Sequence, residues 1–125
     1  MMDDSKKVLI VDDDTRNIFA LRAFLRAKKY ACISAGSASE GMAILGDDSR
    51  VGAVLMDMMM PDMDGYEAIR EIRKKPGLEK IPIIAVTANA MMGDREKCLQ
   101  AGADEYISKP INIESLLRML EGYLK

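Results

Sequence analysis

Five short apolar runs alternate along this chain with longer segments whose apolar residues recur every three or four positions. Short apolar runs predict β-strands, and the longer spacing predicts amphipathic helices. The strands are expected at Val8–Val11, Ala31–Ala35, Ala53–Met56, Ile83–Val86 and Glu105–Ile107. The first, third and fourth runs are apolar throughout, as in strands covered on both faces, whereas the second and fifth are more polar and suit sheet edges. The alternation predicts an α/β fold, with a parallel sheet, right-handed crossovers and helices on both faces.

Helical stripes fill the intervals between the expected strands. In chain order they contain Ile18, Leu21 and Leu25; Met42 and Leu45; Ala68, Ile69 and Ile72; Met91, Cys98 and Leu99; and Ile113, Leu116, Leu117 and Leu120. Ser37 followed by Glu40 indicates a capping box at the start of the second helix. Gly46, Gly77 and Gly102 are expected just past helix ends.

Length and charge limit the classes of function that this chain can serve. Its 125 residues suit one domain, spanning residues 1–125. The net charge of −2 offers no basic face for nucleic acid. No apolar run approaches the roughly 20 residues of a membrane helix, and the acidic start does not resemble a secretory signal. We therefore expect a cytoplasmic protein that binds neither nucleic acid nor membrane.

Cysteine and histidine usage narrows the chemistry further. Cys32 and Cys98 match no metal-binding or redox spacing, so we expect reduced thiols that serve packing. The chain contains no histidine. Histidine-based acid–base catalysis, histidine metal ligands and a phosphohistidine donor within this chain are thereby excluded.

Polar residues follow the expected strands where each one ends. They are Asp12, Asp13 and Asp14 after the first strand, Asp57 after the third, Thr87 after the fourth, and Lys109 with Pro110 after the fifth. In an open α/β sheet, ligands bind beyond the carboxyl ends of the strands. We therefore expect carboxylates, a hydroxyl and an ammonium group to gather at one edge of the sheet.

The chemistry of such a cluster is specific. Asp12, Asp13 and Asp57 would repel one another if all were ionised, and either protonation or a bound cation relieves this repulsion. Oxygen ligands suit Mg²⁺, which commonly binds one or two carboxylates together with a phosphate. A carboxylate flanked by a metal, the Lys109 ammonium and the Thr87 hydroxyl is arranged as a nucleophile towards phosphorus.

Each residue also has an ordinary interpretation when it is taken alone. Asp14 could simply cap the following helix, Asp57 could be a turn residue, and Lys109 could be a solvated charge. The strand pattern favours the joint interpretation, because it places these residues at the same edge.

Four segments resemble the receiver domains of two-component signalling systems: Val8–Asp14, Leu55–Gly65, Ile83–Ala88 and Ala101–Pro110. The resemblance covers essentially the whole chain, in order and in spacing. It implies a flavodoxin-like, doubly wound, five-stranded parallel sheet in the order 2-1-3-4-5. It also implies a response regulator that accepts a phosphoryl group from a histidine kinase or a histidine phosphotransfer protein. A receiver catalyses its own phosphotransfer and dephosphorylation and has no external substrate.

The resemblance assigns roles to matching positions. Asp57 resembles the phosphoacceptor. Asp13, Asp57 and the backbone carbonyl of Met59 would bind Mg²⁺, for which Mn²⁺ could substitute, and Asp12 would act through a metal-bound water. Thr87 would hydrogen-bond the phosphoryl group, and Lys109 would pair with it.

Three further positions follow from the same resemblance. The small Ala88 would leave room for the phosphoryl group, and the Lys109–Pro110 bond is expected to be cis. Tyr106 matches the aromatic switch, which swings inward as Thr87 moves; an amphipathic aromatic on an edge strand is the alternative. The output partner, whose identity the sequence does not give, would dock on the fourth helix, fifth strand and fifth helix.

Some features leave more than one interpretation open. The spacing from Asp13 to Asn17 resembles receivers of hybrid sensor kinases, although a surface asparagine is an equal alternative. Met58–Met60 and Met91–Met92 favour gap-filling over an adaptable docking surface. An aspartyl-phosphate hydrolase and a constitutive interaction domain are the alternative functions. The first is disfavoured because Met59 stands where haloacid-dehalogenase-like enzymes carry a second carboxylate, and because no insertion could form a cap. The second is disfavoured because no member of the set Asp12, Asp13, Asp57, Thr87 and Lys109 is missing.

Overall fold

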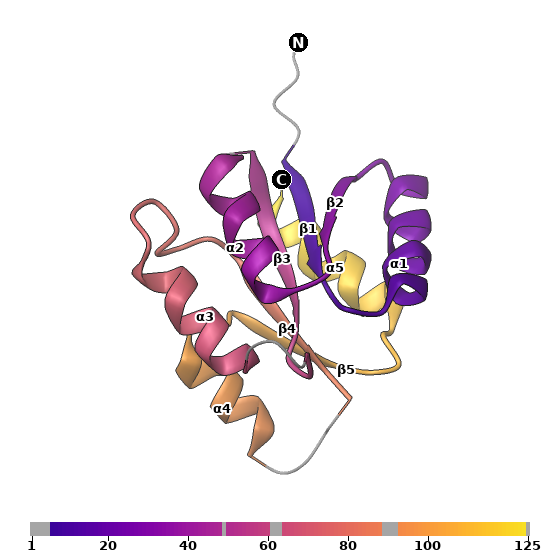
Figure 1. The fold of residues 1–125 in the computed structure, drawn as a ribbon. Coiled ribbons are helices and arrows are strands. Elements are labelled where there is room, and N and C mark those ends of the chain that lie inside the picture. Colours follow the sequence, from indigo (N-terminus) through magenta and orange to yellow (C-terminus); the bar gives the residue numbers. More distant parts are fainter. Residues whose placement is uncertain (1–5, 49, 61–63, 89–92, 125) are drawn as a thin grey trace.

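A computed structural model describes residues 6–48, 50–60, 64–88 and 93–124 of the chain. Five parallel strands form a single sheet in the order β2-β1-β3-β4-β5 (Figure 1). They are β1 (Lys7–Val11), β2 (Ala31–Ala35), β3 (Val51–Asp57), β4 (Ile83–Thr87) and β5 (Glu105–Ser108). The predicted fold class, strand order and edge positions of the second and fifth strands are confirmed.

The strands are slightly longer than the apolar runs that predicted them. β3 begins at Val51 and includes Asp57, and β4 includes Thr87. All residues of β3 and β4 are buried, whereas β2 is exposed or half-buried at four of its five positions. Asp57 and Thr87 are therefore the last residues of fully buried strands, and their polar groups emerge where the apolar core ends.

Helices cover both faces of the sheet (Figure 1). They are α1 (Thr15–Ala27), α2 (Ala38–Asp47), α3 (Gly65–Lys74), α4 (Asp94–Ala101) and α5 (Ile113–Tyr123). One core lies between the sheet and α2, α3 and α4, and a second lies between the sheet and α1 and α5. Alternate residues of β1 serve the two cores: Leu9 packs into the first, and Val8 and Ile10 into the second. None of the described helices is long and apolar enough to cross a membrane.

The caps agree in part with the sequence pattern. The Ser37 hydroxyl accepts a hydrogen bond from the Glu40 N–H at 3.1 Å, but the Glu40 carboxylate returns to the Gly36 N–H rather than to Ser37. Gly102 caps α4 with a φ of 123°. Gly46 was expected after the second helix, and this prediction is wrong, because α2 continues to Asp47.

The methionines can be compared with their predictions only in part. Met91 was expected on the fourth helix, and Met91–Met92 in gap-filling positions; both residues lie outside the described residues, and α4 begins at Asp94. Met58 and Met60 are buried, which agrees with gap-filling, whereas Met59 is 58% exposed.

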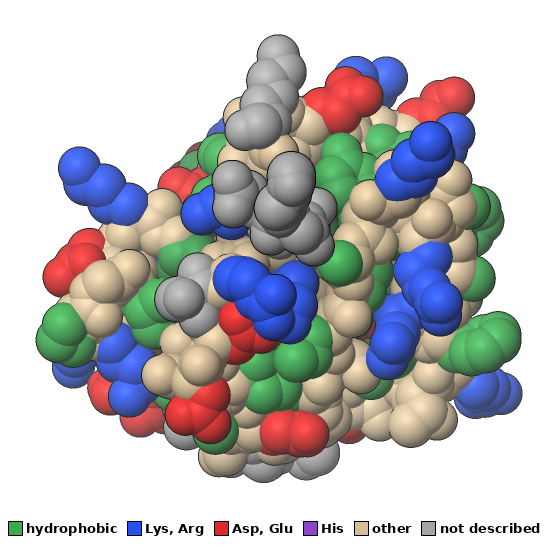
Figure 2. Space-filling model, turned by 90° about the horizontal axis from the view of Figure 1, so that it is seen from above, with side chains coloured by type: hydrophobic (Ala, Val, Ile, Leu, Met, Phe, Trp, Pro, Cys, Tyr) green, Lys and Arg blue, Asp and Glu red, His purple; other side chains and the backbone are tan. Residues whose placement is uncertain are grey.

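The end of the molecule at which the strands begin lies opposite the edge at which they end, where Asp57 and Thr87 lie. Figure 2 looks onto this end and shows acidic and basic side chains mixed over most of it, with Lys and Arg side chains gathered over α1 at the right. The charged residues of α1 are Arg16, Arg22 and Arg26, all basic.

Candidate functional site

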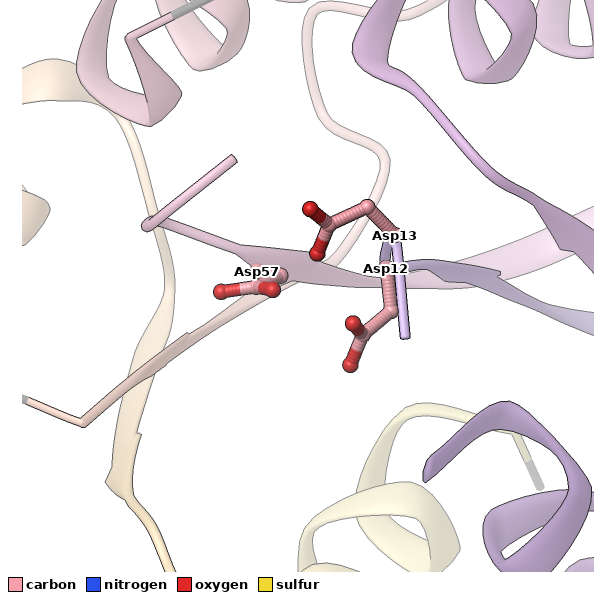
Figure 3. Close-up of side chains that lie close together, drawn as sticks. All are labelled: Asp12, Asp13 and Asp57. Carbon is pink, nitrogen blue, oxygen red and sulfur yellow. The ribbon is translucent and has the colours of Figure 1, made fainter. Parts of the chain in front are cut away.

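Three carboxylates meet at the carboxyl ends of two neighbouring strands. Asp12 and Asp13 follow β1, and Asp57 ends β3, which pairs with β1 (Figure 3). One carboxylate oxygen from each residue lies within 4.8 Å of the other two. Asp12 and Asp57 are buried, and Asp13 is exposed. The structure therefore brings together the three acidic residues that the sequence placed at this edge.

Asp12 is held by the first turn of α1. Its Oδ1 accepts a hydrogen bond from the Asp14 N–H at 2.9 Å, and its Oδ2 accepts one from the Asn17 side-chain amide. Asp14 caps α1 by accepting a hydrogen bond from the Arg16 N–H at 3.0 Å, which was its ordinary interpretation. Asn17 is therefore not merely a surface asparagine: it orients a carboxylate of the site.

Asp57 is almost fully enclosed, with 4% of its surface exposed. Its Oδ1 accepts a hydrogen bond from the Met59 N–H at 3.0 Å. Burial raises the pKa of the Asp57 carboxyl above its ordinary value, and the charge of Asp12 raises it further, while the Met59 N–H and Lys109 oppose this rise. Two buried carboxylates side by side favour the binding of positive charge between them.

Lys109 supplies part of that charge. Its Nζ lies 3.7 Å from Asp57 Oδ2 and 3.8 Å from Asp12 Oδ2. Its backbone N–H donates to the Thr87 carbonyl at 2.7 Å, which ties the end of β5 to the end of β4. The Lys109–Pro110 peptide bond is cis. Lys109 thus reaches the acidic cluster from the end of the edge strand β5, across the end of β4.

Thr87 and Ala88 complete the rim. Thr87 is 1% exposed at the end of β4, next to β3 in the sheet. Ala88 follows it and is exposed. A hydroxyl and a small residue therefore lie at the strand end beside Asp57, on the side away from Asp12 and Asp13.

The donor set fits a hard divalent cation. Three carboxylates supply only oxygen atoms, and Lys109 balances part of their negative charge. Carboxylate and carbonyl oxygens are the protein ligands that Mg²⁺ prefers. The carboxylates of Asp12, Asp13 and Asp57 could hold it.

Tyr106 lies outside this cluster. It pairs with Ala85 in the sheet and packs against the core beneath α3 and α4. Two neighbours there, Tyr66 and Asp94, are joined by a hydrogen bond from the tyrosine hydroxyl to the carboxylate. Neither neighbour could be selected from the sequence, because neither follows a strand end.

Comparison with known proteins gives the same family as the residues do. Residues 8–121 match the family described as the response regulator receiver domain. The polar-differentiation response regulator DivK of Brucella anthropi is 35% identical over 119 residues, which span 95% of this chain and 96% of that protein.

Solved structures agree. The receiver domain of the sensor histidine kinase PA1611 from Pseudomonas aeruginosa, with magnesium coordinated in its active-site cleft, is 38% identical with a TM-score of 0.86, over 96% of this chain and 98% of that one. A co-crystal structure of the Saccharomyces cerevisiae phosphotransfer protein Ypd1 and the Ssk1 receiver domain matches at 28% identity and a TM-score of 0.85, over 96% and 89% of the two chains. Strand order, site composition and the match over most of the sequence agree, and the chain belongs to the response regulator receiver family of two-component signalling.

Proposed function

We propose that this receiver accepts a phosphoryl group on Asp57 and uses it to switch a partner-binding surface. The observation that carries the proposal is the meeting of three carboxylates within 4.8 Å, with the Lys109 ammonium 3.7 Å from Asp57. Asp57 is a buried member of this cluster, and one N–H and one ammonium already orient it. We propose a single receiver domain over residues 1–125.

The transfer needs little covalent chemistry from the protein. A carboxylate oxygen of Asp57 attacks phosphorus as the bond from phosphorus to the donor's imidazole nitrogen breaks. The electron pair remains on that nitrogen. Catalysis then consists of positioning and of neutralising the phosphoryl oxygens. In this proposal Lys109 pairs with one oxygen, the Thr87 hydroxyl donates to another, and Ala88 leaves room for the group.

A bound Mg²⁺ would supply the remaining positive charge for the phosphoryl oxygens. The proposed ligands are Asp13, Asp57 and the Met59 carbonyl, and Asp12 contributes through a water molecule. Mn²⁺ should substitute, because it also accepts oxygen ligands. Support comes from the all-oxygen donor set and from the magnesium-bound PA1611 receiver.

The enzyme alternative has less support. A hydrolase of related geometry needs a general acid beside the nucleophile. At the second position after Asp57, this chain offers Met59, whose side chain points into solvent and whose N–H bonds Asp57. We therefore propose that the chain catalyses only its own phosphorylation and dephosphorylation.

Intact-mass spectrometry after incubation with acetyl phosphate and Mg²⁺ tests the proposal. One added phosphoryl group per chain is expected, and it should be absent from Asp57→Asn, which keeps the side-chain shape but loses the nucleophile. Asp14→Asn is the matched control, since asparagine also caps helices and Asp14 lies outside the cluster. An unphosphorylated wild type would indicate a constitutive interaction domain. Rapid multiple turnover of acetyl phosphate would indicate a hydrolase.

The proposed phosphodonor is a histidine kinase or a histidine phosphotransfer protein. The co-crystal of Ypd1 with a receiver supports a donor of this class. On this chain, Phe19 and Phe24 of α1 are 76% and 52% exposed. They follow Asn17, which lies at the site, by about half a turn and about two turns of the helix. Exposed aromatic side chains beside a reactive centre are surface that a docked protein could cover.

Phe19→Ala separates docking from chemistry. Phosphorylation by a protein donor should slow about tenfold or more, on the scale of a truncated interface anchor. Phosphorylation by acetyl phosphate should stay unchanged, because this donor needs no protein surface. The control is Ala43→Ser on α2, also exposed but on the other face of the sheet. Equal rates with the protein donor would place the docking surface elsewhere.

The proposed output surface consists of α4, β5 and α5. Thr87 moves towards the phosphoryl group, and Tyr106 fills the space behind it, so that the population shifts between two packings. We propose a cytoplasmic location, which suits the free thiols of Cys32 and Cys98.

A further inference from the structure

Four side chains from three elements meet beneath the start of α4. They are Tyr66 of α3, Asp94 and Cys98 of α4, and Tyr106 of β5. Asp94 is 8% exposed, so its carboxylate belongs to the interior. The group lies apart from the acidic cluster, and the phosphoryl transfer proposed above makes no use of it.

The Asp94 carboxylate has an unequal set of contacts. Its Oδ1 accepts a hydrogen bond from the Tyr66 hydroxyl. Its Oδ2 is closed off from solvent and has no hydrogen-bond partner among the described residues. An aspartate in the first turn of a helix ordinarily turns to the free backbone N–H groups there. The Asp94 carboxylate faces the tyrosines instead, and its Oδ2 has no donor within the described ranges.

Tyr106 is the nearby group that could fill this acceptor. Burial raises the pKa of the Tyr106 hydroxyl, and the negative charge of Asp94 raises it further. The same carboxylate is the main cause of the raised pKa of Tyr66. Both tyrosines therefore lie within the electrostatic reach of one carboxylate, with Cys98 as the other titratable group in contact.

We propose that Asp94 is a positioning residue of the switch, with Oδ1 holding Tyr66 on α3 and Oδ2 serving as the acceptor for the Tyr106 hydroxyl. The proposal rests on the switching role proposed for Tyr106. A buried acceptor without a donor is unfavourable, and for a charged group more so. Oδ2 lacks a donor in the part of the chain that the structure describes, and rotation of the Tyr106 hydroxyl towards it would supply one. Movement of Tyr106 is thereby coupled to the start of α4, and α3 anchors the pair.

Ring-resolved NMR titration of Tyr66 and Tyr106 tests this coupling in the apo protein. In Asp94→Asn both tyrosines should ionise at lower pH than in wild type, because the negative charge is gone and the side-chain shape remains. Glu96→Gln, an exposed charge on the same helix, should leave both unchanged. A purely structural contact would lower the pKa of Tyr66 alone, and an unchanged Tyr106 would overturn the proposal.

A second variant keeps the test decisive if Asp94→Asn fails to fold. Tyr66→Phe removes the competing hydroxyl, so the pKa of Tyr106 should rise further; an unchanged or lowered value would overturn the proposal. Acetyl phosphate labelling in the same samples separates the two proposals. If the wild type is not phosphorylated, the proposed function fails, whereas the tyrosine titrations still decide the role of Asp94.

Discussion

The surroundings of Asp57 act on the pKa of its carboxyl group in opposite directions. Burial and the charge of Asp12 favour the neutral carboxyl, whereas the Met59 N–H and Lys109 favour the carboxylate. A divalent cation beside Asp57 would act in the same direction as the Met59 N–H and Lys109 and would favour the ionised nucleophile. Metal binding and nucleophile activation are therefore expected to be two consequences of one charge arrangement.

Asp13 is the residue at which this arrangement can be tested with least disturbance, because it is exposed. Asp13→Asn should weaken Mg²⁺ binding by at least about tenfold, since a metal ligand should cost no less than its supporting groups. It should also raise the melting temperature without Mg²⁺, because a like charge beside Asp12 and Asp57 is removed. Isothermal calorimetry and thermal unfolding measure the two effects.

The neighbouring Asp14→Asn is the control, with the same change of charge one residue away. Its carboxylate caps α1 and is not part of the cluster. Equal Mg²⁺ affinity in Asp13→Asn and wild type would remove Asp13 from the ligand set.

Among individual residues, those at the ends of strands could be predicted from the sequence, whereas a buried residue such as Asp94 could not. Asp12, Asp13, Asp57, Thr87 and Lys109 could be found because strand ends of a parallel sheet share an edge. Asp94 is the first residue of α4, a position at which an aspartate is ordinarily solvated. Its burial depends on how α3 and α4 pack against β5, which residue spacing does not encode.

Arg73 of α3 connects the segments that precede β4 and β5. From α3 it donates to the Gly102 carbonyl at the end of α4 and to the Ile81 carbonyl before β4. It also pairs with Asp104 at 2.9 Å, just before β5. The planar guanidinium can serve acceptors in several directions at once, which an ammonium cannot do as well. Arg73 thus fixes two chain connections, α3–β4 and α4–β5, relative to α3.

Arg73→Ala should lower the free energy of unfolding by about 2–3 kcal/mol, because it leaves part-buried carbonyls without their charged donor. Urea denaturation measures this change. Arg70→Ala removes an exposed arginine from the same helix and should have little effect. Similar midpoints for the two variants would show that the Arg73 contacts contribute nothing to stability.

Element ends were harder to predict than the elements themselves. Gly46 suggested the end of a helix, yet α2 continues past it, because a glycine inside a helix is unfavourable but tolerated. Gly102 was placed correctly, since its φ of 123° is one that other residues rarely adopt. A glycine marks a boundary reliably only where the backbone requires it.

Across the whole molecule, the proposed site and output surface lie on adjoining strands. β3 carries Asp57, β4 carries Thr87, and β5 carries Tyr106, and these strands are neighbours in the sheet. Beside Tyr106, α4 begins at the buried Asp94. A displacement of Thr87 can therefore reach the helical surface through one strand and one side chain, without a change of fold.

Beryllofluoride with Mg²⁺, which imitates a phosphoryl group on a carboxylate, should reveal this path by amide NMR. Signals of Tyr106 and of residues between Met91 and Gly102 are expected to shift, including those of α4 (Asp94–Ala101), because Tyr106 packs beneath this helix. Signals of α2 should change little, because this helix packs mainly against β1, β2 and α3 rather than against β4 and β5. Asp57→Asn is the control and should not respond. The size of the population shift is limited by the difference in affinity of the phosphoryl mimic for the two packings. If the shifts stop at residues adjoining Asp57, the chain would be a phosphoacceptor without this switch, and the output surface would have to be sought nearer the site.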